Sequence, residues 1–158
     1  MSVEYVALAR AIHVMALVHW IGGVAIVTTI VLPAARRMPN ALEAIAAFEQ
    51  FERRFAAQVR VSIALVGASG LYMLDVFDAW DRFEHLSFWW MHLMVAVWAL
   101  FAIMVYVVEP LLVHRRFHQL ALRDKNRAFT IAIRLHAVAL GISTVAIAAG
   151  VIGAHGGL

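Results

Sequence analysis

The chain has 158 residues, of which 64% are hydrophobic and only 15% are charged, and its mean hydropathy is +0.83. So few polar side chains cannot cover a soluble globule of this length, which excludes water as the main solvent. The absence of cysteine excludes disulfides, thiolate metal sites and a nucleophilic thiol. A transmembrane helix needs about 20 apolar residues, so four of them use almost the whole chain. We therefore expect an all-α integral membrane protein, a four-transmembrane-helix bundle formed by one domain, residues 1–158.

The first expected span runs from about Val3 to Leu32 and ends at Pro33, because proline removes a backbone donor. This run is too long for the apolar core of a signal peptide, so we expect it to be retained. An amphipathic stretch from Ala41 to Arg54 follows, with apolar residues at helical spacing. It is predicted to lie at the membrane interface and to lead directly into the second span, about Ala56 to Leu74.

The third span is expected from about Leu86 to Val113, and its first residues include the interfacial aromatics Trp89 and Trp90. Pro110 predicts a kink or an end of this helix, before a basic loop that extends to Arg127. The fourth span is expected from about Ala128 to Gly153. Small residues on the second and fourth spans predict close contacts between helices: Gly67, Gly70, Gly141, Ser143, Ala146, Ala149 and Gly150.

Lysine and arginine are distributed unequally between the two sides of the expected membrane. Of the 13 Lys and Arg residues, only Arg10 and Arg82 fall on one side, whose loop between residues 75 and 85 is acidic. The positive-inside rule therefore places both termini outside and the basic connections in the cytoplasm, as in a multi-pass protein of a bacterial-type inner membrane. Anionic lipid headgroups then account for the sequence pI of about 10, and no groove-reading motif predicts nucleic-acid binding.

Four of the eight histidines lie inside expected spans: His13, His19, His92 and His136. Ionisable side chains at membrane depth are costly and usually functional, although a neutral imidazole can serve simply as a hydrogen-bond partner. Four of them on three helices favour haem b, which a helix bundle can hold between imidazoles from two helices. His13 and His92 lie at similar depths near the outer ends of their spans, so we expect them to ligate one iron.

A second, deeper haem is an alternative to a purely structural role for the other two histidines. His19 follows His13 by six positions, so it points about 120° away and lies about 9 Å deeper, which excludes a shared iron. His136 lies at a depth similar to that of His19, and these two would ligate the second iron. The sequence leaves open whether one or two haems bind.

Haem propionates need cationic partners, and three arginines qualify. Arg10 lies one turn before His13, while Arg60 and Arg134 would serve a deeper cofactor. The simpler role of Arg60 is to extend to the lipid headgroups.

Copper is the alternative metal, because imidazole and thioether ligands suit Cu(I). The seven methionines are scattered, however, and lack the close spacing of a copper path, which favours a packing role. No motif for hydrolase or kinase chemistry occurs.

Several short motifs resemble a known family. Arg10-Ala11-Ile12-His13 followed by Trp20-Ile21-Gly22-Gly23 resembles the first-helix pattern of the copper-resistance protein D (CopD) family, and also that of the related HemJ family of haem-binding protoporphyrinogen oxidases. Phe51-Glu52-Arg53-Arg54-Phe55 and Trp90-Met91-His92 continue the likeness. The resemblance implies a compact helical membrane fold and haem b ligation by His13, matches His92 to the helix-three histidine, and adds Trp20 to the candidate cofactor-binding residues. This chain has Met94 where HemJ sequences have lysine, and Arg134 is not followed by their Asn-Glu-x-Pro element.

Three functions are consistent with these patterns. The first is a cytochrome b-like protein that exchanges electrons with quinone or a redox protein, and the sequence leaves open whether it is also an oxidoreductase enzyme. The second is a HemJ-like oxidase with a porphyrin substrate. The third is a copper transport or tolerance protein. Association into a homo-oligomer is left open as well.

Overall fold

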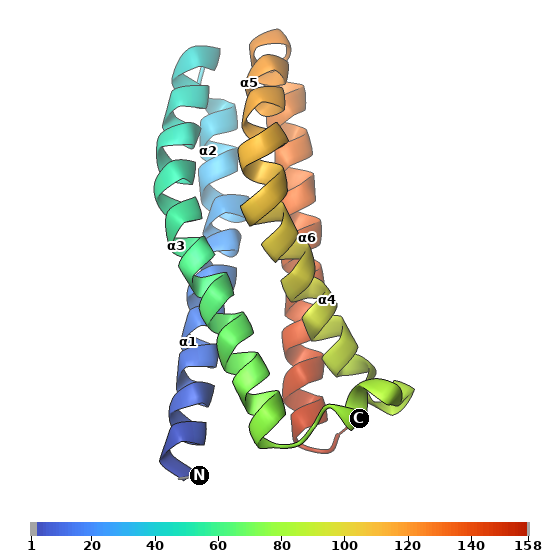
Figure 1. Cartoon of the computed structure of the whole chain (residues 1–158). Helices are drawn as coiled ribbons and strands as arrows, with labels where there is room; N and C mark the ends of the chain where they lie inside the picture. The colour runs from blue at the N-terminus through green and yellow to red at the C-terminus, as the bar shows by residue number, and fades with distance from the viewer. Residues whose placement is uncertain (1–2, 158) are drawn as a thin grey trace.

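The computed structural model describes residues 3–157, without the side chains of residues 112–115, and these residues form an all-α bundle (Figure 1). Within this range four helical stretches are long and apolar enough to cross a membrane: Val3–Arg37, Ala41–Val76, Leu86–Leu111 and Lys125–Ala154. Large apolar side chains cover much of the surface, among them Met15 at 73% and Val18 at 65% exposure. Such a surface suits lipid and not water as the solvent. The chain is a multi-pass membrane protein, as the sequence predicted.

The first helix continues past the proline at which the sequence predicted its end. α1 (Val3–Ile26) leads into a π-helical segment, Val27–Val31, and then into α2 (Leu32–Arg37). Pro33 lies in the first turn of α2, and the wider turns of the π segment before it change the hydrogen-bond register. The prediction that Pro33 ends the helix is therefore wrong, and the helix ends at Arg37 instead.

α3 (Ala41–Val76) contains the amphipathic stretch and the second span in one uninterrupted helix. It begins at Asn40, whose side chain accepts a hydrogen bond from the Leu42 backbone N–H. At about 1.5 Å per residue a helix of 36 residues is about 54 Å long, whereas the hydrocarbon core is about 30 Å thick. The amphipathic part therefore extends beyond the hydrocarbon, beside α2 and α5 (Figure 1).

Pro110 does not end the third span either. Two 3-10 turns, Asp81–Glu84 and Leu86–Phe88, lead into α4 (Trp89–Ile103), and a π-helical segment, Met104–Val113, continues past Pro110 into α5 (His114–Arg123). The wider π turn accommodates a proline ring that would clash inside an α-helix.

The basic loop predicted after Pro110 is consequently wrong, because most of its residues form α5. A single residue, Asp124, separates α5 from α6 (Lys125–Ala154), and its side chain caps α6 by accepting from the Arg127 backbone N–H. Two members of that predicted loop, His114 and Arg115, have side chains outside the described residues.

The four spans form two closely packed pairs, α1 with α3 and α4 with α6. Both ends of the described chain lie at one end of the bundle, and α2 and α5 lie at the other (Figure 1). We call the end with α2 and α5 the basic end, because 11 of the 13 Lys and Arg residues belong to the half of the bundle that contains it. Four spans that alternate in direction predict this placement of both ends of the chain at one end of the bundle.

Small residues bring the helices into close contact. A Cβ added to Gly67 would lie 2.5 Å from the ring of Trp98, so the indole of α4 packs directly on the backbone of α3. A Cβ at Gly150 would lie 2.5 Å from the Met94 sulfur, which joins α6 to α4 in the same way. A Cβ added to Gly141 would have no neighbouring atom within 4 Å, and the residue is exposed. The predicted helix contact is therefore wrong at that position.

Candidate functional site

The ring of His13 on α1 is held by a serine of α3. His13 Nδ1 lies 3.0 Å from Ser69 Oγ, and that oxygen lies 2.5 Å from the Leu65 carbonyl oxygen and 3.2 Å from the Val66 carbonyl oxygen. The hydroxyl has one hydrogen, which it donates to these carbonyls, so its oxygen accepts a hydrogen bond from His13 Nδ1–H. In a neutral imidazole this assignment leaves a lone pair on Nε2, which is the electron pair that a metal ion requires.

A second pair of the same kind lies deeper in the bundle. His19 Nδ1 lies 2.9 Å from Oγ of Ser62, a serine of α3 that is only 5% exposed. The step of six residues from His13 to His19 matches the step of seven residues from Ser69 back to Ser62, because α1 and α3 are antiparallel. Sequence reasoning missed both serines, although two serines one heptad apart in an apolar span were a readable signal.

His92, in the first turn of α4, has a carbonyl oxygen opposite each ring nitrogen. Nδ1 lies 3.1 Å from the Phe88 oxygen and Nε2 lies 3.0 Å from the Phe83 oxygen, while the ring packs edge-on against Phe83. A neutral imidazole has one N–H, so it can satisfy only one of the two carbonyls. At the other nitrogen, the lone pair of the ring faces a lone pair of the carbonyl oxygen. Metal binding through Nε2 therefore requires the Phe83 carbonyl to move away.

Contacts between α4 and α3 indicate the level of His92 in the bundle. Trp90 and Met91 pack with Leu74 near the end that holds the termini, and the indole N–H of Trp98 donates to the Ile63 carbonyl deeper in the bundle. His92 directly follows Met91, so it lies near the level of Leu74, which is five residues or about 7.5 Å along α3 from Ser69. The rings have separate partners, and the described residues include no cluster of three or more His, Asp or Glu side chains arranged to hold a metal ion.

His136 on α6 is also held through Nδ1, which donates to the Ala132 carbonyl oxygen at 2.9 Å. Its Nε2 therefore carries the lone pair in the neutral ring. Leu140, one turn away, packs against the core cluster that contains Trp20, and Ile133 packs against the cluster nearer the basic end. His136 consequently lies within about two turns of the depth of His19. Arg134, the proposed partner of a deeper cofactor, is exposed.

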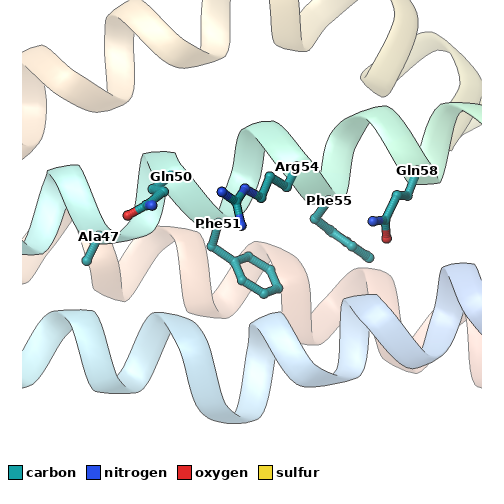
Figure 2. A pocket seen from close by; sticks show the side chains of 6 residues that line it. All are labelled: Ala47, Gln50, Phe51, Arg54, Phe55 and Gln58. Atoms are coloured by element: carbon teal, nitrogen blue, oxygen red, sulfur yellow. The ribbon is translucent and has the colours of Figure 1, made fainter.

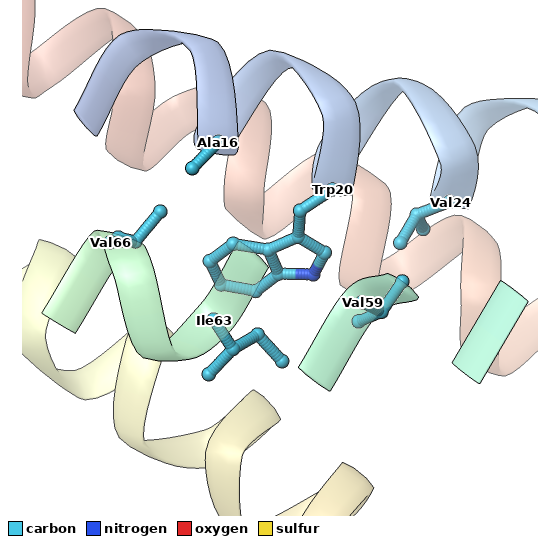
Figure 3. Packing of buried hydrophobic residues seen from close by; sticks show 6 residues of the cluster. All are labelled: Ala16, Trp20, Val24, Val59, Ile63 and Val66. Carbon is cyan, nitrogen blue, oxygen red and sulfur yellow. The ribbon is translucent and has the colours of Figure 1, made fainter. Parts of the chain in front are cut away.

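Trp20 fills the middle of the bundle and is only 2% exposed. Figure 3 shows its indole among aliphatic side chains from α1 and α3, and its ring packs edge-on against Phe101 of α4, with centroids 4.8 Å apart. The indole N–H has no hydrogen-bond partner in the described part of the chain. Such a buried donor costs about 1–3 kcal/mol. In this packing the indole joins α1, which carries His13 and His19, to α3 and α4.

The candidate cations near the histidines have different partners. The Arg10 guanidinium lies over the ring of Phe77, 5.2 Å from its centroid, at the same end of the bundle as His13. Arg60 lies 3.5 Å from the Glu109 carboxylate, which gives it a charged partner within the bundle. Glu109 is the only acidic residue of the third span, and sequence reasoning passed over it.

Two open pockets lie in the basic half of the bundle, away from His13 and His92. The first has a volume of about 440 Å³ and follows one face of α3 (Figure 2); it is lined by Ala47, Gln50, Phe51, Arg54, Phe55 and Gln58. The second has a volume of about 350 Å³ and lies between α2 and α6; it is lined by Pro33, Arg36, Arg37, Asn126 and Ile133. Neither pocket is lined by a histidine.

Comparisons with known proteins leave the family open. No family model matches the chain, and no curated protein or solved structure matches it either. The likeness to the CopD and HemJ families therefore rests on the short motifs alone. A proposal about function therefore depends on the geometry around the histidines.

Proposed function

We propose that this chain is a haem b-binding membrane protein that transfers electrons, with His13 as an axial ligand through Nε2. The observation that carries the proposal is the hydrogen-bond chain from His13 through Ser69 to the Leu65 carbonyl, which directs the ring proton to Nδ1 and leaves the Nε2 lone pair available. Histidine ligands are commonly oriented by such a bond at the other ring nitrogen. Haem b would supply a one-electron couple at this place.

His92 is the proposed second ligand. Its Nδ1 already faces the Phe88 carbonyl, and a bond there holds the ring in the same tautomer as that of His13. With the proton on Nδ1, the contact between Nε2 and the Phe83 oxygen is a repulsion between lone pairs, so little stability is lost when it opens. The turn Asp81–Glu84, which contains Phe83, would have to move for this, whereas the Phe88 carbonyl would stay at Nδ1.

The expected topology determines the side on which electrons would be exchanged. His13 and His92 lie toward the end that holds the termini, which the positive-inside rule places outside the inner membrane. Arg10 lies at that end too and is the proposed partner of a haem propionate. Quinone within the bilayer or a redox protein at the outer surface is the proposed electron partner.

An absorption spectrum tests the proposal. Protein purified in detergent and supplied with haem should show a reduced-minus-oxidised b-type spectrum. His13→Ala and His92→Ala should each abolish that spectrum or convert it to a five-coordinate type. His155→Ala is the matched control, because His155 also bonds through Nδ1 to the carbonyl four residues earlier but is exposed at the end of α6.

Other outcomes would favour an alternative function or refute the proposal. A protein that stays colourless with haem but carries stoichiometric copper would favour copper transport or tolerance. Rescue of a strain that lacks protoporphyrinogen oxidase would favour a HemJ-like enzyme. A haem spectrum unchanged in both the His13 and His92 variants would move the site to His19 and His136.

A further inference from the structure

The pocket between α2 and α6 at the basic end has the composition of an anion site. Arg36 and Arg37, in the last turn of α2, line it together with Asn126 from the first turn of α6. Both guanidinium groups are exposed, and neither forms an ion pair with a carboxylate among the residues that the structure describes. Asp124, two residues before Asn126, caps α6 by accepting from the Arg127 N–H.

The walls of this pocket are held together independently of any ligand. Lys125 at the start of α6 donates through Nζ to the Met38 carbonyl at the end of α2. Since this bond joins the two helices directly beside the arginines, the pocket has a defined width. A guanidinium group on this wall can donate in parallel to two oxygens of one phosphate group.

The polarity of the pocket changes along the helices. Ile133 lies seven residues beyond Asn126 on α6, about 10 Å along the axis toward the middle of the bundle, and Pro33 lies one turn before Arg37. Donors therefore lie at the end of the pocket that faces the headgroups, and apolar side chains lie at the end that faces the hydrocarbon. A phospholipid has the same order of groups, whereas a free phosphate would occupy only the polar end.

From this arrangement we infer that the pocket between α2 and α6 binds one anionic phospholipid, with its phosphate at Arg36, Arg37 and Asn126 and its first acyl carbons along Ile133. Basic pockets between membrane helices on the cytoplasmic side are known to hold anionic headgroups. The inference does not depend on haem binding, because none of these residues touches the histidine sites.

Native mass spectrometry of the detergent-purified protein, titrated with phosphatidylglycerol or phosphatidylcholine, tests this site. Phosphatidylglycerol should bind in preference. A contribution of about 1 kcal/mol per arginine corresponds to about fivefold in affinity, so Arg36→Gln with Arg37→Gln should weaken phosphatidylglycerol binding by roughly 25-fold. Arg123→Gln with Arg127→Gln removes the same charge from exposed positions outside the pocket and should change the affinity little. An equal loss in both double variants would reduce the effect to general electrostatics and overturn the inference.

Ile133→Trp distinguishes binding of a lipid from binding of a free anion. It also tests the site without the arginine variants, whose loss of binding could result from misfolding. The indole would fill the apolar end of the pocket and leave both guanidinium groups in place. Phosphatidylglycerol binding should fall at least fivefold while the unfolding temperature and elution volume stay those of the parent protein. Unchanged phosphatidylglycerol binding in Ile133→Trp, or competition by inorganic phosphate at concentrations comparable to the lipid, would show a site for free anions and refute lipid binding.

Discussion

Replacement of Ser69 by alanine tests whether the hydrogen-bond chain at His13 prepares a metal ligand. The variant removes the acceptor of the Nδ1 proton, 3.0 Å away, and leaves the backbone of α3 unchanged. A buried donor that loses its partner costs about 1–3 kcal/mol, and partners of this kind change metal affinity by about 10- to 100-fold. The two figures agree, because a factor of ten corresponds to about 1.4 kcal/mol. We therefore expect haem affinity to fall by between one and two powers of ten in Ser69→Ala.

The assay is a haem titration of the detergent-solubilised protein, followed by absorption at the Soret band, together with the midpoint potential of the bound haem. Ser62→Ala is the matched control, because it removes the same kind of bond, 2.9 Å long, from His19 on the same pair of helices. Its haem affinity should stay within about threefold of the parent protein. Equal affinities and potentials in the parent protein and Ser69→Ala would refute the role assigned to Ser69, even if haem binds.

Two further predictions concern the packing of the bundle, and both are measured by thermal unfolding in detergent. Gly67→Ala should cost about 1–3 kcal/mol, because the new Cβ meets the Trp98 ring 2.5 Å away and that ring is tied by its N–H to the Ile63 carbonyl. Gly150→Ala should cost less than about 1 kcal/mol, because the flexible Met94 side chain can rotate away; equal losses in the two variants would contradict this. A double-mutant cycle of Arg60→Gln and Glu109→Gln should give a coupling of about 0.2–1 kcal/mol, since 38% of the Arg60 side chain is exposed, and a coupling above about 2 kcal/mol would show that lipid excludes water from this pair.

The surroundings of His92 differ from those of His13 in a way that matters for the proposed haem ligation. The Ser69 hydroxyl oxygen accepts the ring proton of His13 at Nδ1, which leaves the lone pair of the neutral ring on Nε2. His92 faces two acceptors, and neither neutral tautomer satisfies both. This unfavourable contact lies between α4 and the turns before it, which are the elements that would have to rearrange when a ligand binds. The variants His13→Ala and His92→Ala consequently test two different things: a prepared ligand and one that requires rearrangement.

The sequence alone determined the number and order of the spans, because about 20 apolar residues in succession have no stable place outside a membrane. It also predicted the amphipathic first part of α3 and the unequal distribution of charge, which are local properties of the chain. It failed at Pro33, and of the two alternatives at Pro110 the end of the helix is excluded, because π-helical segments let both helices continue. The expectation that proline ends a helix assumes α-helical geometry on both sides, and the sequence did not indicate the wider turns.

Only the tertiary structure decided the partners of the histidines. Helical spacing placed His13 and His92 at similar depths, but it did not show that Ser69 of α3 accepts the proton of one ring or that two loop carbonyls face the other. Arg60, expected at the headgroups, pairs with Glu109, which lies 49 residues away in the sequence. Depth follows from counting residues along one helix, whereas partners depend on how neighbouring helices pack. For this protein the sequence therefore indicates which side chains lie in the membrane, and the packing of α1 on α3 determines the hydrogen-bond partners of His13 and His19.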